Sequence, residues 1–132
     1  MIAVDTSALI AICMDEAERD QFIDAMKRAK RILLSSATLV EARMVAFNKG
    51  NAGLVEQLDQ LLETFDFEVV PPDAEQAEIA HAAFLAYGKG HGHPAGLNFG
   101  DLFSYALAKT RGVPLLYKGG DFARTDIGTA VR

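Results

Sequence analysis

The chain opens with Met1-Ile2-Ala3-Val4-Asp5-Thr6-Ser7-Ala8-Leu9, in which a short apolar run ends at a carboxylate and is followed by a second apolar run. Residues 2–5 are typical of a short buried strand, and residues 7–13 are typical of a helix. A carboxylate at the edge of a buried element is costly unless it is paired or bound to a metal ion. The segment therefore predicts a strand that places Asp5 at a functional edge of a sheet.

The rest of the chain repeats this alternation of short apolar strands and longer helices. Further strands are expected at 31–34, 67–70 and 115–117, and helices at about 16–29, 36–48, 54–65, 73–87 and 100–111. Such alternation implies an α/β fold with a parallel sheet covered by helices on both faces. In sheets of this kind, ligands bind outside the carboxyl ends of the strands.

Length and composition indicate a globular protein of one domain. The chain has 132 residues, of which 50% are hydrophobic and 23% are charged. No apolar run reaches the roughly 20 residues that span a bilayer, and the first residues lack the features of a secretory signal. A single cysteine suits a reducing compartment, so we expect a cytoplasmic protein with no membrane contact.

The net charge of −5 bears on the kind of partner. It argues against a protein that binds nucleic acid through a broad basic face. It does not exclude a nuclease, since bound cations offset clustered carboxylates locally. An acidic balance also suits a basic protein partner.

Four acidic residues lie directly beside apolar runs: Asp5, Glu41, Asp101 and Asp121. The first ends the first predicted strand, the last follows the fourth, and the other two fall in the first turns of predicted helices. We expect all four to reach one edge of the sheet. Carboxylates are the ligands that Mg²⁺ prefers, and such a site can activate water and stabilise a leaving oxygen. Without metal, crowded carboxylates raise one another's pKa.

Each acid also has a structural interpretation as a helix cap. Asp5 could be an N-cap, and Asp121 could cap a last short helix. The segments 38–41 and 98–101 both fit a capping box, with Glu41 or Asp101 in the third helical position. Helix capping alone gives no reason for four acids to lie at one edge of the sheet, so it is a weaker explanation of the whole set.

The ordered set of acidic segments resembles the PIN-domain ribonucleases, in particular their VapC-type toxin branch. Segments 1–9, 36–42, 97–108 and 116–122 resemble the four family motifs, and the likeness runs from residue 1 to about 127. It implies a three-layer α/β/α fold with a central parallel sheet, forming a single PIN domain over residues 1–132. It also implies an endoribonuclease toxin of a toxin–antitoxin pair that depends on Mg²⁺ or Mn²⁺.

The resemblance assigns roles to the four acids. Asp5 and Asp101 would be direct metal ligands, while Glu41 and Asp121 would complete the site, orient water or hold a second ion. Thr6 or Ser7 would add a hydroxyl. The implied partners are an RNA substrate, a cognate antitoxin that pushes a basic side chain toward the acids, and a second copy in a homodimer. Many relatives carry Asn or Asp where this chain has Gly120. The glycine lacks such a ligand, which weakens the part of the site that would hold a second metal ion.

Two other functions fit parts of the pattern. A catalytically idle PIN-like binding module would keep the fold and a partner surface, and Gly120 is the feature in its favour. Another small Mg²⁺ phosphohydrolase would need an aspartyl nucleophile with a second Asp nearby, which the segment 5–7 lacks.

Several other residues have chemistry of their own. The three histidines, His81, His91 and His93, are interpreted as surface and loop residues, because zinc needs about four well-placed ligands. A contact of their basic loop, which includes Lys89, with RNA is an alternative.

Cys13 is expected to be a buried structural thiol. Lys118 and Arg43 flank the acids and are either phosphate contacts or ordinary surface cations. Asp126 is a nearby carboxylate without an assigned role. The apolar stripe from Leu54 to Phe65 is expected to be core or a dimer face.

Overall fold

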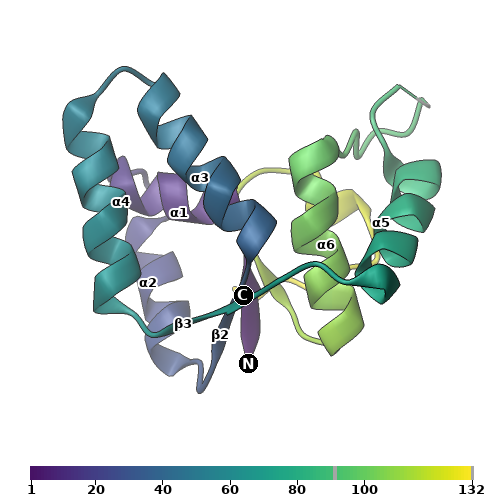
Figure 1. Ribbon diagram of the computed structural model, residues 1–132, viewed down its shortest axis with the longest axis horizontal. Helices are drawn as coiled ribbons and strands as arrows, with labels where there is room; N and C mark the ends of the chain where they lie inside the picture. Colours follow the sequence, from purple (N-terminus) through teal and green to yellow (C-terminus); the bar gives the residue numbers. More distant parts are fainter. Residues whose placement is uncertain (91, 132) are drawn as a thin grey trace.

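The computed structural model describes residues 1–90 and 92–131. His91, one of the three histidines considered above, lies outside the described residues. Within these ranges the chain folds as four short strands and six α-helices, followed by one turn of 3-10 helix (Figure 1).

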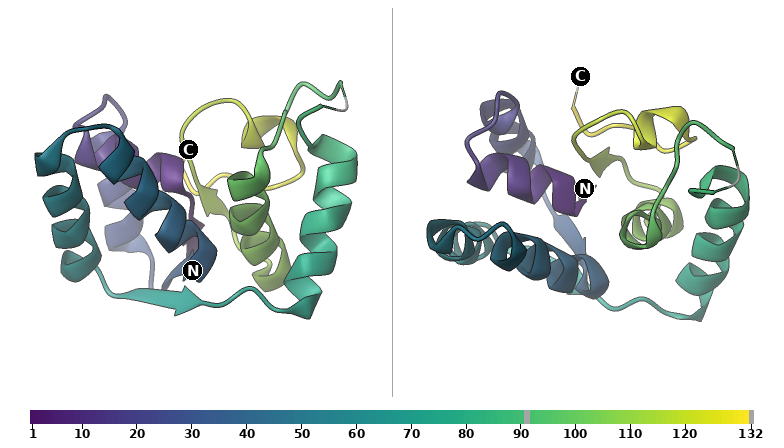
Figure 2. Two further views of the ribbon diagram at one scale, coloured as in Figure 1. Left: turned by 45° about the horizontal axis from the view of Figure 1, so that its top comes forward. Right: turned by 90° about the horizontal axis from the view of Figure 1, so that it is seen from above.

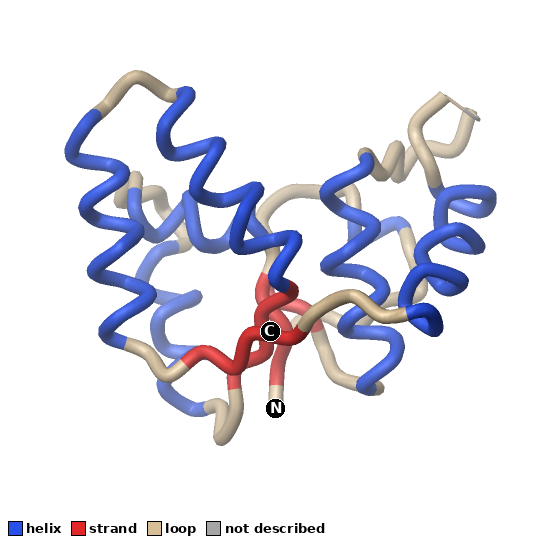
Figure 3. Tube along the Cα trace, viewed as in Figure 1, coloured by secondary structure: helices blue, strands red, loops and turns tan. Residues whose placement is uncertain are grey.

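The centre of the molecule is an all-parallel sheet. Its strands are β1 (Ile2–Val4), β2 (Ile32–Ser35), β3 (Phe67–Val70) and β4 (Leu115–Leu116), in the order β3-β2-β1-β4 (Figure 3). Ala3 of the central β1 pairs with Leu33 on one side and Leu115 on the other. Because successive strand residues point to opposite faces, Ile2 and Val4 pack into one core cluster and Ala3 into the other.

Helices cover both faces of this sheet, which confirms the three-layer α/β/α architecture (Figure 2). One layer contains α1 (Thr6–Cys13), α2 (Arg19–Arg28), α3 (Ser36–Asn48) and α4 (Ala52–Thr64). The other contains α5 (Ala74–Tyr87) and α6 (Phe99–Arg111), with the short η1 (Phe122–Arg124). The predicted apolar stripe of α4 belongs to the core, since Leu54, Leu58 and Leu61 are buried.

The predicted boundaries differ from the structure mainly at α2. The helix was expected from about residue 16 but begins at Arg19. Asp15 adopts a left-handed conformation, with φ of 53°, and the Glu16 backbone N–H bonds back to the Ala11 carbonyl. The chain therefore turns once more before the helix starts, and sequence periodicity does not reveal such a turn.

The strand order reverses at β1, because the chain passes from β1 to β2 on one side and adds β4 on the other. Parallel strands end at the same edge, so the residues that follow β1 and β4 meet where the order reverses. That position is the usual ligand site of an open α/β sheet. In the described ranges, even the longest helix, α5 with 14 residues, is too short to cross a membrane.

Candidate active site

Asp5 is both a helix cap and the buried centre of the acidic site. It directly follows β1 and caps α1, its Oδ2 accepting hydrogen bonds from the Ser7 backbone N–H at 3.0 Å and the Ser7 hydroxyl at 2.7 Å. Its Oδ1 accepts a hydrogen bond from the Ser104 hydroxyl at 2.5 Å. Only 2% of the residue is exposed. Three donors therefore fix the carboxylate in one orientation.

Ser104 extends this arrangement into the protein interior. Its Oγ lies 3.1 Å from Oγ1 of Thr38, and both residues are almost fully buried. The sequence analysis missed this pair of hydroxyls. The spacing contained a hint, because Ser104 follows Asp101 by three residues and so lies on the same face of the helix.

Glu41 reaches the site from the second turn of α3. The N-cap of this helix is Ser35, which accepts a hydrogen bond from the Ala37 N–H at 3.2 Å. The predicted capping box over 38–41 is therefore wrong, since these residues lie inside the helix. The Glu41 carboxylate instead accepts a hydrogen bond from the Thr6 hydroxyl at 2.5 Å. Burial, with a smaller contribution from the charge of Asp5, raises the pKa of Glu41 against the opposing effect of the Thr6 bond.

Gly100 makes room for Glu41. A Cβ atom added at Gly100 would lie 1.7 Å from Oε2 of Glu41, far inside van der Waals contact. Only glycine therefore lets the first turn of α6 approach the carboxylate of α3 so closely. The sequence analysis did not single out this glycine.

Asp101 combines a capping role with a place in the site. Asn98 and Asp101 form the predicted capping box, with bonds of 2.9 Å and 3.0 Å between each side chain and the other backbone N–H. Burial raises the pKa of Asp101 to about 7, and the charges of Asp5, Glu41 and Asp121 contribute in the same direction. The expectation that these acids perturb one another is confirmed for Asp101 and Glu41.

Asp121 is the exposed member of the group. It precedes η1, but its side chain makes no capping hydrogen bond, so the predicted capping role is wrong. The loop that carries it is tied to the site through Lys118, whose backbone N–H donates to the Ser7 hydroxyl at 3.0 Å. Ser7 thus joins Asp5 to the loop of Asp121.

The donor set suits a hard divalent cation. The site offers carboxylate oxygens. Burial is the main cause of the raised pKa values of Asp101 and Glu41, and neighbouring negative charge, which a cation would offset, adds a smaller part. Among the described residues, no three acidic, histidine or cysteine side chains already converge on one metal position. Asp5 and Asp101 are the pair that would hold an ion.

The two cations considered as phosphate contacts already have acidic partners. The Lys118 ammonium lies 2.7 Å from Glu16, and the Arg43 guanidinium lies 2.7 Å from Asp59. These contacts pair Lys118 and Arg43 with acids other than the four of the acidic site.

Asp126 has a structural place outside the acidic site. It accepts hydrogen bonds from the Tyr105 hydroxyl at 2.5 Å and the Lys109 ammonium at 2.6 Å. The bonds from Lys109 and Tyr105 lower the pKa of Asp126. The carboxylate therefore joins the C-terminal segment to α6.

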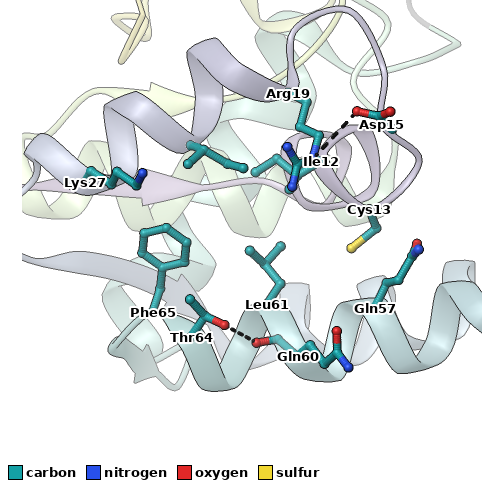
Figure 4. A pocket seen from close by; sticks show the side chains of 11 residues that line it. Ile12, Cys13, Asp15, Arg19, Lys27, Gln57, Gln60, Leu61, Thr64 and Phe65 are labelled. Carbon is teal, nitrogen blue, oxygen red and sulfur yellow. Dashed lines mark hydrogen bonds and ion pairs between the residues drawn. The ribbon is translucent and has the colours of Figure 1, made fainter.

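The remaining candidates also lie away from the acids. His81 is exposed, and Nδ1 of His93 accepts a hydrogen bond from the Ala95 N–H at 3.0 Å. Cys13 is half-buried rather than buried, and it lines a pocket between α1, α2 and α4 (Figure 4). Burial raises the pKa of its thiol to about 11, so the thiol is protonated at neutral pH.

Comparison with known proteins agrees with this geometry. Residues 2–128 match the family model of the PIN domain. Ribonuclease VapC28 of Mycobacterium tuberculosis is 44% identical over 128 residues, which are 97% of this chain and 96% of that protein. Ribonuclease VapC42 of the same organism is 39% identical over 127 residues, which are 96% of this chain and 97% of that protein.

Solved structures share the fold at lower identity. VapC20 of M. tuberculosis, described as a Sarcin-Ricin loop cleaving toxin, has a TM-score of 0.74 and 21% identity and covers 100% of this chain and 99% of its own. A toxin–antitoxin complex from Klebsiella pneumoniae has a TM-score of 0.68 and 21% identity, with 93% and 91% covered. The chain therefore belongs to the PIN-domain family and, within it, to the VapC ribonucleases.

Proposed function

We propose that this chain is the toxin of a toxin–antitoxin pair and cleaves RNA internally with Mg²⁺ or Mn²⁺ at Asp5, Glu41, Asp101 and Asp121. The observation that carries the proposal is the meeting of acids from distant parts of the sequence: beside Asp101 on α6, Ser104 donates to Asp5 and Gly100 lies against the Glu41 carboxylate. A single PIN domain over residues 1–132, acting in the cytoplasm, is part of the same proposal.

The roles of the four acids follow from their surroundings. A bound divalent cation supplies Lewis acidity toward a phosphodiester oxygen and lowers the pKa of water. Asp5, held by three donors, and Asp101 would bind the cation. Glu41, whose pKa is raised mainly by burial, would orient the attacking water. Asp121 would complete the site from its exposed loop.

The proposed protein partners are a cognate antitoxin and a second copy of this chain. Structures with the same fold include toxin–antitoxin complexes from Klebsiella pneumoniae and Rickettsia felis. A basic antitoxin side chain near Asp101 would meet the unneutralised charge of the acids, and the net charge of −5 favours such a partner. An exposed apolar strip on α3, formed by Val40, Met44 and Phe47, is consistent with a homodimer.

The test is cleavage of RNA by purified variants in Mg²⁺ or Mn²⁺. Asp5→Asn and Asp101→Asn should each reduce cleavage by about 100-fold or more while the fold survives, because each removes charge from the cation site. Asp66→Asn is the matched control, since it makes the same change at an exposed acid between α4 and β3 and should leave cleavage intact. Circular dichroism and thermal unfolding would verify the fold of each variant.

Two results would contradict the proposal. Full activity of Asp101→Asn would show that the acidic site takes no part in the reaction. Cleavage that persists in a chelator would show that the reaction needs no metal ion. An absence of cleavage in the wild type, with antitoxin binding unchanged in Asp101→Asn, would instead favour the idle binding module that Gly120 suggests.

A further inference from the structure

The most exposed of the described large apolar side chains belongs to Phe99, two residues before Asp101. Phe99 is the first residue of α6, and 77% of its surface is exposed. Single exposed apolar residues are common on protein surfaces. An aromatic ring next to candidate catalytic groups is more informative, because its position determines what can approach them.

The backbone fixes where Phe99 lies relative to the acids. Phe99 lies in the sequence between Asn98 and Asp101, the two residues that form the capping box. The next residue, Gly100, lies against the Glu41 carboxylate. Phe99 is therefore held at the rim of the site by the same turn of helix that positions two of the acids.

A second aromatic residue orients the Phe99 ring. The ring of Phe103, one helical turn later, lies with its centroid 4.9 Å away and its plane inclined by 80°. Edge-to-face packing of this kind is a favoured arrangement of aromatic pairs. It restrains the Phe99 ring while most of that ring remains open to solvent.

We propose that Phe99 is a stacking platform for one base of a single-stranded RNA whose neighbouring phosphate lies at the carboxylates. This inference rests on the proposed ribonuclease function. Exposed aromatic rings bind unpaired bases in this way, whereas bases inside a duplex are already stacked. The platform would therefore favour single strands and loops.

The charges around the site support this assignment. The carboxylates repel phosphates, and the net charge of −5 provides no general attraction for RNA. Lys118 and Arg43 are already paired with acids. Stacking provides affinity that does not depend on charge.

The first experiment measures steady-state cleavage by Phe99 variants of the full chain. The substrate is a short labelled single-stranded RNA, recovered from a randomised pool by its cleavage with the wild type in Mg²⁺. Phe99→Ala and Phe99→Leu should raise KM by roughly 5- to 150-fold with little change in kcat, whereas Phe99→Trp should stay near the wild type. Leu85→Ala, at a 61% exposed position on α5, is the control and should change neither parameter.

The second experiment identifies the base that stacks. Nucleotides around the cut are replaced one at a time by abasic residues. At one position, removal of the base should raise the KM of the wild type as much as Phe99→Ala raises it with the intact RNA. The same removal should not raise the KM of Phe99→Ala any further. This non-additivity is the expected mark of a direct contact.

Three outcomes would overturn stacking. The first is a wild-type KM in Phe99→Leu, and the second is the absence of any abasic position coupled to Phe99. The third is an altered sedimentation mass in Phe99→Ala with unchanged KM, because that result would assign the ring to a protein interface. If the wild type cleaves nothing in the pool, the proposed function fails. Fluorescence anisotropy then measures binding of the unselected RNA pool and tests stacking separately. Weaker binding by Phe99→Ala than by the wild type supports stacking, and equal binding excludes it.

Discussion

Single carboxylates in this protein carry two roles at once. Asp5 and Asp101 are helix caps and also members of the acidic site. The two interpretations that the sequence left open are therefore compatible, since capping bonds use one side of a carboxylate and leave the other for neighbouring groups. The cap holds the side chain in the position where it is needed.

The raised pKa of Asp101 predicts how stability depends on pH. Its pKa rises from 3.8 to about 7 on folding, so the native state holds a proton that the unfolded state has lost between about pH 4 and 7. Without metal, the free energy of unfolding should therefore fall as pH rises through this window. In Asp101→Asn, which keeps an acceptor for the cap, the fall should be smaller.

Urea unfolding of both proteins at a series of pH values, with a chelator present, measures this difference. Saturating Mg²⁺ or Mn²⁺ should reduce the wild-type loss, because the cation binds the ionised carboxylates of the native state. Parallel pH profiles of wild type and variant would contradict the prediction.

Ser104→Ala should destabilise the protein and weaken the site. The substitution removes one of three donors to the buried Asp5 carboxylate and leaves the Thr38 hydroxyl without this partner. Loss of a buried hydrogen bond to a charged group costs roughly 1–3 kcal/mol. Urea unfolding should show this loss, together with weaker Mn²⁺ binding by calorimetry. Ser36→Ala, which removes a serine hydroxyl at a half-buried position, provides a comparison.

At the scale of elements, the close approach of α3 and α6 depends on Gly100. Gly100→Ala should displace the Glu41 carboxylate, lower thermal stability and reduce RNA cleavage at least 10-fold, an estimate that follows from the effect of small misplacements of catalytic groups. Gly128→Ala is the matched control, because a Cβ there meets no atom within 4 Å. A double-mutant cycle with Glu41→Ala tests the cause, since the stability cost of Gly100→Ala should largely disappear once the carboxylate is absent.

The elements themselves were largely predictable, but some of their connections were not. Apolar runs and cap residues revealed all four strands, and the capping box at Asn98 was found from its spacing. The late start of α2 depends on the conformation of Asp15, which propensity does not specify. The N-cap of α3 is Ser35 rather than a later residue because β2 runs directly into the helix.

The sequence singled out the four acids as a candidate site but not the neutral residues that contact them. The four acids stood out because charge is rare beside apolar runs. Ser104, Thr38 and Gly100 look like ordinary helix residues, and only the packing of α3 against α6 and β1 gives them a role. Tertiary contacts of this kind have no local sequence pattern.

For the whole molecule, Tyr105 joins α6 to the C-terminal segment through Asp126. Tyr105→Phe should lower the free energy of unfolding by about 0.5–1.5 kcal/mol, because it removes one hydrogen bond from a nearly buried ring. RNA cleavage per folded molecule should not change, since Asp126 lies outside the acidic group. A urea titration and a cleavage assay on the same preparation test both statements, and a large loss of cleavage would assign Asp126 to the site.

The order of the strands has a consequence for biosynthesis. The central strand β1 ends at Val4, whereas its neighbour β4 begins at Leu115 and the loop of Asp121 follows β4. A nascent chain on the ribosome therefore lacks one side of its sheet and one of its four acids until residues 115–121 have been made. Under the proposed function, the growing chain would therefore lack a complete acidic site while it is still beside the messenger RNA that encodes it.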